Sequence, residues 1–242
     1  MRNLEVCLSP ELIKNYGEDN KIVVVVDILR ATSCMVTAFE HGVKTIIPVS
    51  SLEECEVYKQ KGYITAAERN GKIVEGFDMG NSPFSYMNPS FKGKAIVVTT
   101  TNGTSAIQRL DKAKEVIIGS FLNKSAIAKY LIKKKEDVLI LCAGWKGKMN
   151  LEDTIFAGAL VEELKDHFYF ENDSAFAAQT LYHCSCNDLF HFITVNSSHY
   201  KRLKGLHLDE DIKFCLQQDI YNVIPVLKDG VLVNTKKETV KV

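Results

Sequence analysis

The chain has 242 residues, of which 25% are charged and 46% are apolar, and 30 basic side chains balance 30 acidic ones. A chain of this length buries enough surface to fold without disulfides or a structural metal. Its apolar content excludes an intrinsically disordered protein. A net charge of zero without a basic stripe argues against a nucleic-acid-binding protein, whose affinity comes mainly from clustered lysines and arginines.

The seven cysteines have no regular spacing, which is typical of reduced thiols and not of a disulfide framework. The N-terminal residues show no apolar signal region, and apolar runs such as Ile22–Val26 are far shorter than the roughly 20 residues of a membrane span. We therefore expect a cytoplasmic protein with neither nucleic acid nor membrane as a partner. A homo-oligomer is compatible with the sequence.

Short β-branched segments alternate with amphipathic stretches, a pattern typical of a sheet covered by helices on both faces. The expected strands are Leu4–Leu8, Ile22–Asp27, Thr45–Val49, Ala95–Thr100, Val116–Gly119 and Val138–Cys142. The expected helices are Ala31–His41, Leu52–Gln60, one that begins at Asn123 or Ser125, and Leu151–Leu164. Because most of these strands are almost entirely apolar, as strands buried on both faces are, we predict a three-layer α/β/α fold with a mostly parallel mixed sheet.

The pattern changes after Glu171. The elements expected there are helices near Ser174–Cys184 and Glu210–Leu216 and strands Val223–Leu227 and Val231–Val233. The last two flank an Asp-Gly pair, which is typical of a tight hairpin turn. Since no long linker or repeat interrupts the chain, we predict a single domain over residues 1–242 with a C-terminal α+β extension packed onto it.

Polar residues gather where the expected strands end, and ligands of open α/β sheets bind at these carboxyl ends. The strand Ile22–Asp27 places Asp27 at its tip and Arg30 at the start of the next helix. Such a carboxylate can bind Mg²⁺, and an arginine can hold phosphate or sulfonate oxygens. The alternative is an aspartate that caps the helix beside a surface arginine.

A second cluster closes the strand that ends near residue 100. Thr100, Asn102, Gly103 and Thr104 supply hydroxyls, an amide and a glycine that permits close approach of the backbone. Together they could cradle a phosphate-sized anion, although the lysine of a Walker loop is missing. The alternative is a threonine-rich turn whose hydroxyls bond local backbone groups.

Two further groups carry acids. Glu152 and Asp153 lie in the first turn of an expected helix, where they either favour the helix dipole or act as metal ligands or a general base. The glycine-rich loop over residues 67–83 carries Glu68, Arg69, Asp78 and Asn81. This loop is either an exposed turn or part of an active site.

The remaining histidines and cysteines carry weaker signals. A zinc site around His183 and Cys184 is disfavoured because the Cys-x-Cys pair has no matching second pair. His199 and His207 lie in a polar stretch and are expected at the surface. Cys142 is expected to be a buried structural cysteine.

Taken in order, these segments resemble the 2-phosphosulfolactate phosphatase (ComB) family. The matching strings are V-V-D-I-L-R-A-T-S, A-E-R-N-G, G-F-D-M-G-N-S-P, T-T-T-N-G-T-S-A, G-S-F-L-N, C-A-G and E-D-T-I-F-A-G-A-L, followed by D-I-K-F-C and V-I-P-V. The resemblance implies the family's own α/β/α fold. It also implies Mg²⁺-dependent hydrolysis of (R)-2-phospho-3-sulfolactate to (R)-3-sulfolactate and phosphate.

The family's motif positions fall on Asp27, Arg30, Glu68, Arg69, Asp78, Asn81, Thr100, Asn102, Gly103, Asn123, Glu152 and Asp153. The individual roles are our own hypotheses. We assign catalysis to Asp27, Glu68 and Asp78, and Mg²⁺ binding to Asp27 with Glu152 or Asp153. We assign substrate binding to Arg30, Arg69, Asn81, Thr100, Asn102, Gly103, Thr104 and Asn123. Both direct attack by water and a covalent route through Asp27 stay open.

Three rival functions remain. One is a cysteine hydrolase of the isochorismatase type built on Asp27, Lys94 and Cys142, which predicts inactivation by thiol-alkylating reagents and no need for metal. Another is a phosphatase that acts on a different phosphorylated hydroxy acid. The third is an anion-binding protein that performs no turnover.

Overall fold

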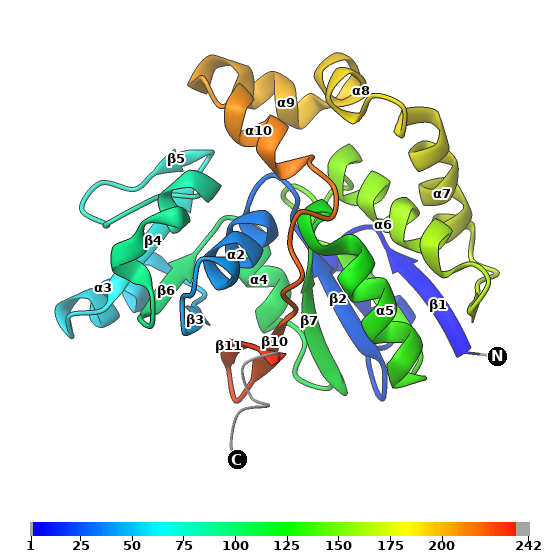
Figure 1. The fold of residues 1–242 in the computed structure, drawn as a ribbon, viewed down its shortest axis with the longest axis horizontal. Helices are drawn as coiled ribbons and strands as arrows, with labels where there is room; N and C mark the ends of the chain where they lie inside the picture. Colours follow the sequence, from blue (N-terminus) through cyan, green and yellow to red (C-terminus); the bar gives the residue numbers. More distant parts are fainter. Residues whose placement is uncertain (1, 236–242) are drawn as a thin grey trace.

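The computed structural model describes residues 2–235 and contains an 11-stranded mixed sheet flanked by helices (Figure 1). The strands are β1 (Arg2–Cys7), β2 (Ile22–Val26), β3 (Thr45–Pro48), β4 (Ile64–Arg69), β5 (Lys72–Ile73), β6 (Ala95–Thr99), β7 (Glu115–Gly119), β8 (Val138–Cys142), β9 (Phe168–Tyr169), β10 (Pro225–Lys228) and β11 (Val231–Asn234). Their order across the sheet is β5-β4-β6-β3-β11-β10-β7-β2-β8-β1-β9.

The helices connect and cover these strands. They are α1 (Ile13–Tyr16), α2 (Ala31–Glu40), α3 (Leu52–Gln60), α4 (Gly103–Gln108), α5 (Lys124–Lys134), α6 (Leu151–Leu164), α7 (Asp173–Ser185), α8 (Leu189–Asn196), α9 (Ser198–Leu203) and α10 (Asp209–Cys215). No helix within residues 2–235 is both long and apolar enough to cross a membrane.

Strand β2 lies near the centre of the sheet and is buried along its whole length. It pairs in parallel with β7 and β8, so that Val24 stands beside Ile117 and Ile140. Val23 and Val25 pack in the same core as α2 and α4, whereas Val24 packs in the core that holds α5 and α6. Because successive side chains of a strand point to opposite faces, helices cover both faces, and the predicted three-layer α/β/α fold is confirmed.

The C-terminal hairpin differs from its prediction as an extension packed onto the domain. It is inserted into the sheet, where β10 pairs antiparallel with β7 and β11 pairs antiparallel with β3. The expected turn is present, since Asp229 and Gly230 both have positive φ angles, as a type I′ turn requires. The predicted single domain also included residue 1 and residues 236–242, which lie outside the described part.

Two regions without a predicted helix or strand form regular structure. The chain around Glu68 forms β4, which pairs in parallel with β6 and antiparallel with β5; its alanines carry little strand signal by themselves. The His- and Ser-containing stretch after residue 186 forms α8 and α9, and the Ser197 side chain caps α9 by accepting the N–H groups of His199 and Tyr200.

Helices α8, α9 and α10 lie together above the sheet in Figure 1. Helices α6 and α7 precede them and pack closely, because a Cβ at Gly158 in α6 would lie only 1.9 Å from the Ala178 carbonyl oxygen in α7. After α7 the chain returns over the end of the sheet where the central parallel strands terminate. A small polar cavity is enclosed between this part of the chain and the strand ends.

Candidate active site

The cavity lies beside the segments that follow β2, β6 and β8, with α9 above them. Its lining residues are Asp27, Leu29, Arg30, Glu68, Gly71, Asn81, Asn102, Trp145, His199 and Leu203. It therefore brings together five of the predicted site residues from four separate segments: Asp27, Arg30, Glu68, Asn81 and Asn102. Its volume of about 20 Å³ is about the space of one water molecule.

Asp27 follows β2 directly and is 7% exposed. The pKa of its carboxyl is raised to about 6. Burial is the largest cause, the Ala31 N–H and the charge of His199 oppose it, and the charges of Glu68 and Glu152 add to it. Gly103 leaves room for this side chain, because a Cβ there would lie 2.9 Å from Asp27 Oδ2. The start of α4 thus packs directly against the carboxylate.

Arg30 is buried and pairs with Asp211 of α10, so the alternative of a surface arginine is wrong. Its second guanidinium nitrogen donates to the Gly71 carbonyl oxygen at 3.1 Å, and the Ser82 hydroxyl donates to the other oxygen of Asp211 at 3.0 Å. A guanidinium has five N–H donors, so Arg30 can join α10 to the β4–β5 turn and still present donors to the cavity.

Glu68 and Arg69 are neighbours in β4, but only the Glu68 side chain lines the cavity. Glu68 lines the cavity and accepts hydrogen bonds from the Gly71 N–H at 2.5 Å and the Thr101 N–H at 3.2 Å. Arg69 donates to the Glu68 carbonyl oxygen at 2.7 Å and to Thr99 Oγ1 at 3.0 Å, and it is absent from the cavity lining. Asp78 accepts both the N–H and the hydroxyl of Thr65 at 2.8 and 2.9 Å and is likewise absent.

The predicted phosphate cradle mostly bonds to itself. The Thr100 N–H donates to Thr104 Oγ1, and the Thr104 N–H donates to Thr100 Oγ1, each at 3.1 Å. Asn102 does line the cavity, and its Oδ1 accepts the Lys146 N–H at 3.3 Å. Asn123 lies elsewhere, donating to the Val223 carbonyl oxygen at 2.9 Å, and thereby fixes the chain that leads into β10.

The two acids that open α6 lie behind the cavity wall. Asp153 accepts the Ile28 N–H at 2.8 Å and the Gly144 N–H at 3.1 Å, joining the loops that follow β2 and β8. Burial, followed by the charge of Asp27, raises its pKa well above the usual range. Glu152 is fully buried, with Oε1 2.5 Å from His199 Nδ1 and Oε2 accepting the Ser197 hydroxyl at 3.2 Å.

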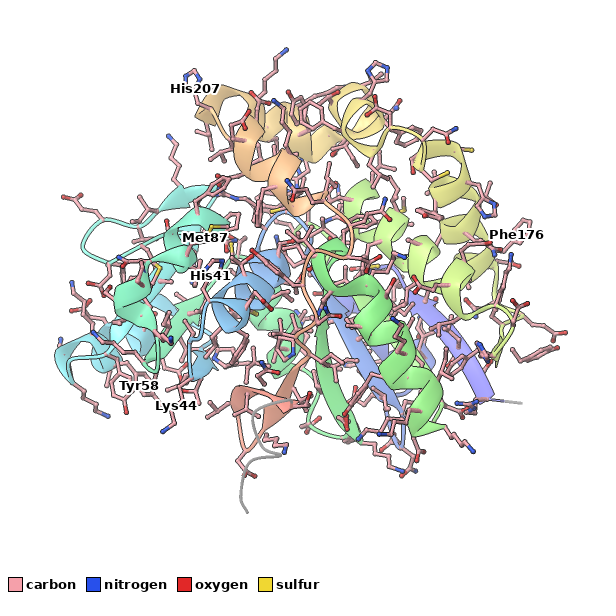
Figure 2. All side chains as sticks on the ribbon, viewed as in Figure 1. His41, Lys44, Tyr58, Met87, Phe176 and His207 are labelled. Atoms are coloured by element: carbon pink, nitrogen blue, oxygen red, sulfur yellow. The ribbon has the colours of Figure 1, made fainter. Side chains whose placement is uncertain are left out.

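His199 is buried at 6% exposure and lines the cavity, so its prediction as a surface residue is wrong. Its ring lies against Trp145, with centroids 5.3 Å apart and planes at 31°. The error arose because α9 comes from a distant part of the chain, and only tertiary packing brings it over the strand ends. Its neighbour His207 is exposed, as predicted, and points away from the molecule in Figure 2.

The geometry disfavours a cysteine hydrolase. Cys142 is fully buried and absent from the cavity lining, and burial raises the pKa of its thiol well above the usual value. Lys94 precedes β6, at the opposite end of that strand from the loop that reaches the cavity. The three residues of that rival site are therefore not assembled around one cavity.

The cavity region is rich in buried acidic side chains. Asp27, Glu68, Glu152 and Asp153 are all buried there, while Arg30 is already paired with Asp211. Asn81 adds an acceptor, because its buried Oδ1 has no hydrogen-bond partner among the described residues. Buried anionic and neutral oxygens of this kind suit a hard cation such as Mg²⁺.

The protein does not supply a complete set of metal ligands by itself, since residues 2–235 contain no group of three or more His, Cys, Asp or Glu side chains placed to hold a metal ion. Mg²⁺ is commonly bound by only one or two carboxylates, together with water and substrate phosphates. A larger open hollow of about 850 Å³ lies beside α1 and the end of α4, but none of the predicted site residues lines it. The small cavity is therefore the candidate active site.

Comparison with known proteins agrees with the sequence motifs. A family model described as 2-phosphosulpholactate phosphatase matches residues 7–230. The chain belongs to this family. Members of this family are phosphoric monoester hydrolases by name, and the match covers every segment that builds the cavity.

Individual relatives match this chain over most of its length. A protein of Caldanaerobacter subterraneus named probable 2-phosphosulfolactate phosphatase is 43% identical over 217 residues, covering 88% of this chain and 90% of its own length. Proteins with the same name from Thermotoga maritima and Clostridium tetani are 42% and 38% identical, covering 88% and 95% of this chain. The matches cover 92% and 99% of the lengths of those two proteins.

Proposed function

We propose that this protein hydrolyses (R)-2-phospho-3-sulfolactate to (R)-3-sulfolactate and phosphate in a Mg²⁺-dependent reaction. The observation that carries the proposal is the cavity in which buried Asp27, Arg30 and the unpartnered oxygen of Asn81 meet. The names of the relatives supply the substrate.

The substrate's charge is the reason to include a cation. A phosphomonoester contributes 1.5 to 2 negative charges near neutral pH, so with a carboxylate and a sulfonate the substrate carries about four. The cavity lining itself includes the acids Asp27 and Glu68, and its one guanidinium, that of Arg30, is paired with Asp211. When bound, Mg²⁺ would neutralise phosphate oxygens and developing charge.

Asp27 and Asn81 are the residues that we propose for this ion, because both line the cavity and supply oxygens. We omit Glu152 and Asp153 from the metal site, since both carboxylate oxygens of each already have hydrogen-bond partners.

The other cavity residues have complementary tasks. The remaining guanidinium donors of Arg30 would bind phosphate or sulfonate oxygens, and the Asn102 amide would orient the substrate. Glu68, held by the Gly71 and Thr101 N–H groups, would accept a proton from the attacking water. We also propose the cytoplasm as the compartment, because all seven cysteines are free and disulfides persist in oxidising compartments.

Phosphate release by the purified protein tests this function. We expect turnover of (R)-2-phospho-3-sulfolactate with Mg²⁺, no turnover in excess chelator, and no effect of thiol alkylation. A 2-phospho-hydroxy acid without the sulfonate serves as the comparison substrate. A higher kcat/KM for that compound would move the proposal to a different hydroxy acid, whereas metal-independent turnover abolished by alkylation would favour the cysteine hydrolase.

A further inference from the structure

His199 and Glu152 form a buried pair at the wall of the cavity. The Glu152 side chain is fully buried, and its Oε1 lies 2.5 Å from His199 Nδ1. Its other oxygen accepts the Ser197 hydroxyl at 3.2 Å, and the same Ser197 oxygen accepts the backbone N–H of His199 at 3.1 Å. Glu152 therefore ties the imidazole to α6 and also bonds the residue that caps α9.

Aromatic packing fixes the plane of the ring. Trp145 lies against His199 with a centroid separation of 5.3 Å, and the Arg202 guanidinium lies 4.6 Å from the centroid of the Trp145 ring. Since Nδ1 is engaged by Glu152, which is absent from the cavity lining, Nε2 is the ring nitrogen left for the cavity. None of the roles proposed above for the phosphatase reaction involves this nitrogen.

We propose that His199 is the general acid that protonates the leaving oxygen of the substrate, and that Glu152 and Trp145 are its positioning residues. The inference rests on the proposed function and adds to it the source of the leaving-group proton. The leaving group is the alkoxide of an aliphatic hydroxy acid, which is strongly basic and departs slowly unless it is protonated.

The proton balance is complete with residues of the cavity. Water attacks phosphorus while the bond between phosphorus and the bridging oxygen breaks, and the proton on Nε2 passes to that oxygen to form the alcohol. The proton of the attacking water passes to Glu68. Solvent then returns a proton to His199 and removes one from Glu68 after phosphate and the hydroxy acid leave.

The other cavity residues are poor candidates for this step. Arg30 keeps its proton at any ordinary pH, and the amides of Asn81 and Asn102 are not acids. Asp27 is the proposed metal ligand, and Glu68 accepts hydrogen bonds from the Gly71 and Thr101 N–H groups. A carboxylate hydrogen-bonded to the inner nitrogen of an imidazole fixes the orientation of the ring and directs its other nitrogen outward, and Glu152 has this position.

The test compares two leaving groups in otherwise identical substrates. One is (R)-2-phospho-3-sulfolactate, and the other is its phosphorothiolate, in which sulfur replaces the bridging oxygen. Thiols are far more acidic than alcohols, as the cysteine pKa of about 8.5 illustrates, so sulfur leaves readily as the thiolate. We expect His199→Asn to lower kcat about 10²- to 10⁴-fold on the oxygen ester and less than about tenfold on the phosphorothiolate, with KM little changed.

His199→Asn is the conservative choice, because the asparagine amide nitrogen can keep the hydrogen bond to Glu152 near the position of Nδ1. Unchanged affinity for 3-sulfolactate, measured by calorimetry, confirms that the variant's site is folded. Glu152→Gln should reduce kcat by a smaller factor with the same preference for the sulfur ester. His207→Asn, an exposed histidine a few residues further along, is the matched control and should leave both rates unchanged.

Equal loss on the two substrates would overturn the inference, as would retention of the oxygen-ester kcat within about tenfold. The oxygen-18 isotope effect at the bridging position gives a second measure that needs only the oxygen ester. It should be larger in His199→Asn than in the wild type, and an unchanged value would also overturn the inference. A wild type that releases no phosphate from either ester would instead contradict the proposed function itself.

Discussion

Asp27→Asn should stabilise the metal-free protein while abolishing its activity. The substitution keeps a side-chain oxygen that can accept the Ala31 N–H, a bond of 3.2 Å in the wild type, but removes a buried negative charge. Burial raises the pKa of Asp27 from 3.8 to about 6. At about 1.4 kcal/mol per pKa unit, ionisation of this side chain costs the folded state about 3 kcal/mol.

The pH dependence follows from the direction of this shift. The folded protein binds the Asp27 proton more tightly than the unfolded chain does, so stability falls as pH rises from about 4 through about 6. The free energy of unfolding of Asp27→Asn should exceed that of the wild type by up to about 3 kcal/mol near pH 7.5. The difference should shrink to about 1 kcal/mol near pH 4.5, where the folded carboxyl is already neutral.

Urea denaturation in excess chelator at the two pH values measures this difference. Asp111→Asn, at an exposed position, is the control and should change stability by less than about 0.5 kcal/mol. The reasoning is refuted if Asp27→Asn is no more stable than the wild type near pH 7.5, or if its advantage does not depend on pH.

Three further results are expected. Mg²⁺ should raise the melting temperature more near pH 7.5 than near pH 5, because the binding carboxylate must be deprotonated; equal shifts in thermal denaturation would contradict this. Asp211→Asn should cost roughly 3–5 kcal/mol in urea denaturation because it leaves Arg30 buried without its partner, and a cost below about 1 kcal/mol would show that the pair matters little. Gly103→Ala should cost about 1–3 kcal/mol and lower kcat, since the new Cβ would lie 2.6 Å from the Ala31 Cβ. Gly205→Ala, where a Cβ meets no atom within 4 Å, is its control, and equal behaviour of the two variants would contradict the packing argument.

The elements with local signals were predictable. Helices α3 and α6 begin and end where expected, and Ser51 and Asn150 cap their N-termini by accepting the Glu54 and Asp153 N–H groups. Strand β8 is a continuous apolar run, and all its residues are buried. The position of the C-terminal hairpin was not predictable, because alternation and turn residues identify two strands without identifying their neighbours in the sheet.

The same limit applies to the site. Asp27 and Asn102 each follow the carboxyl end of a strand, β2 and β6, and both line the cavity, as the preference of ligands for the carboxyl ends of strands suggests. Glu68 and Arg69 diverge because consecutive residues of a strand point to opposite faces, and Arg69 therefore leaves the cavity. His199 was missed because its role depends on the path of α9 over the strand ends, and no local pattern carries that information.

The dependence of phosphate release on Mg²⁺ concentration, measured with (R)-2-phospho-3-sulfolactate for the wild type and Asp27→Asn, tests the central claim most directly. We predict a saturable rise from zero for the wild type and no turnover at any Mg²⁺ concentration for the variant, even though the variant is folded. Full wild-type activity in excess chelator, or near-normal turnover by Asp27→Asn, would contradict a Mg²⁺-dependent phosphatase centred on Asp27.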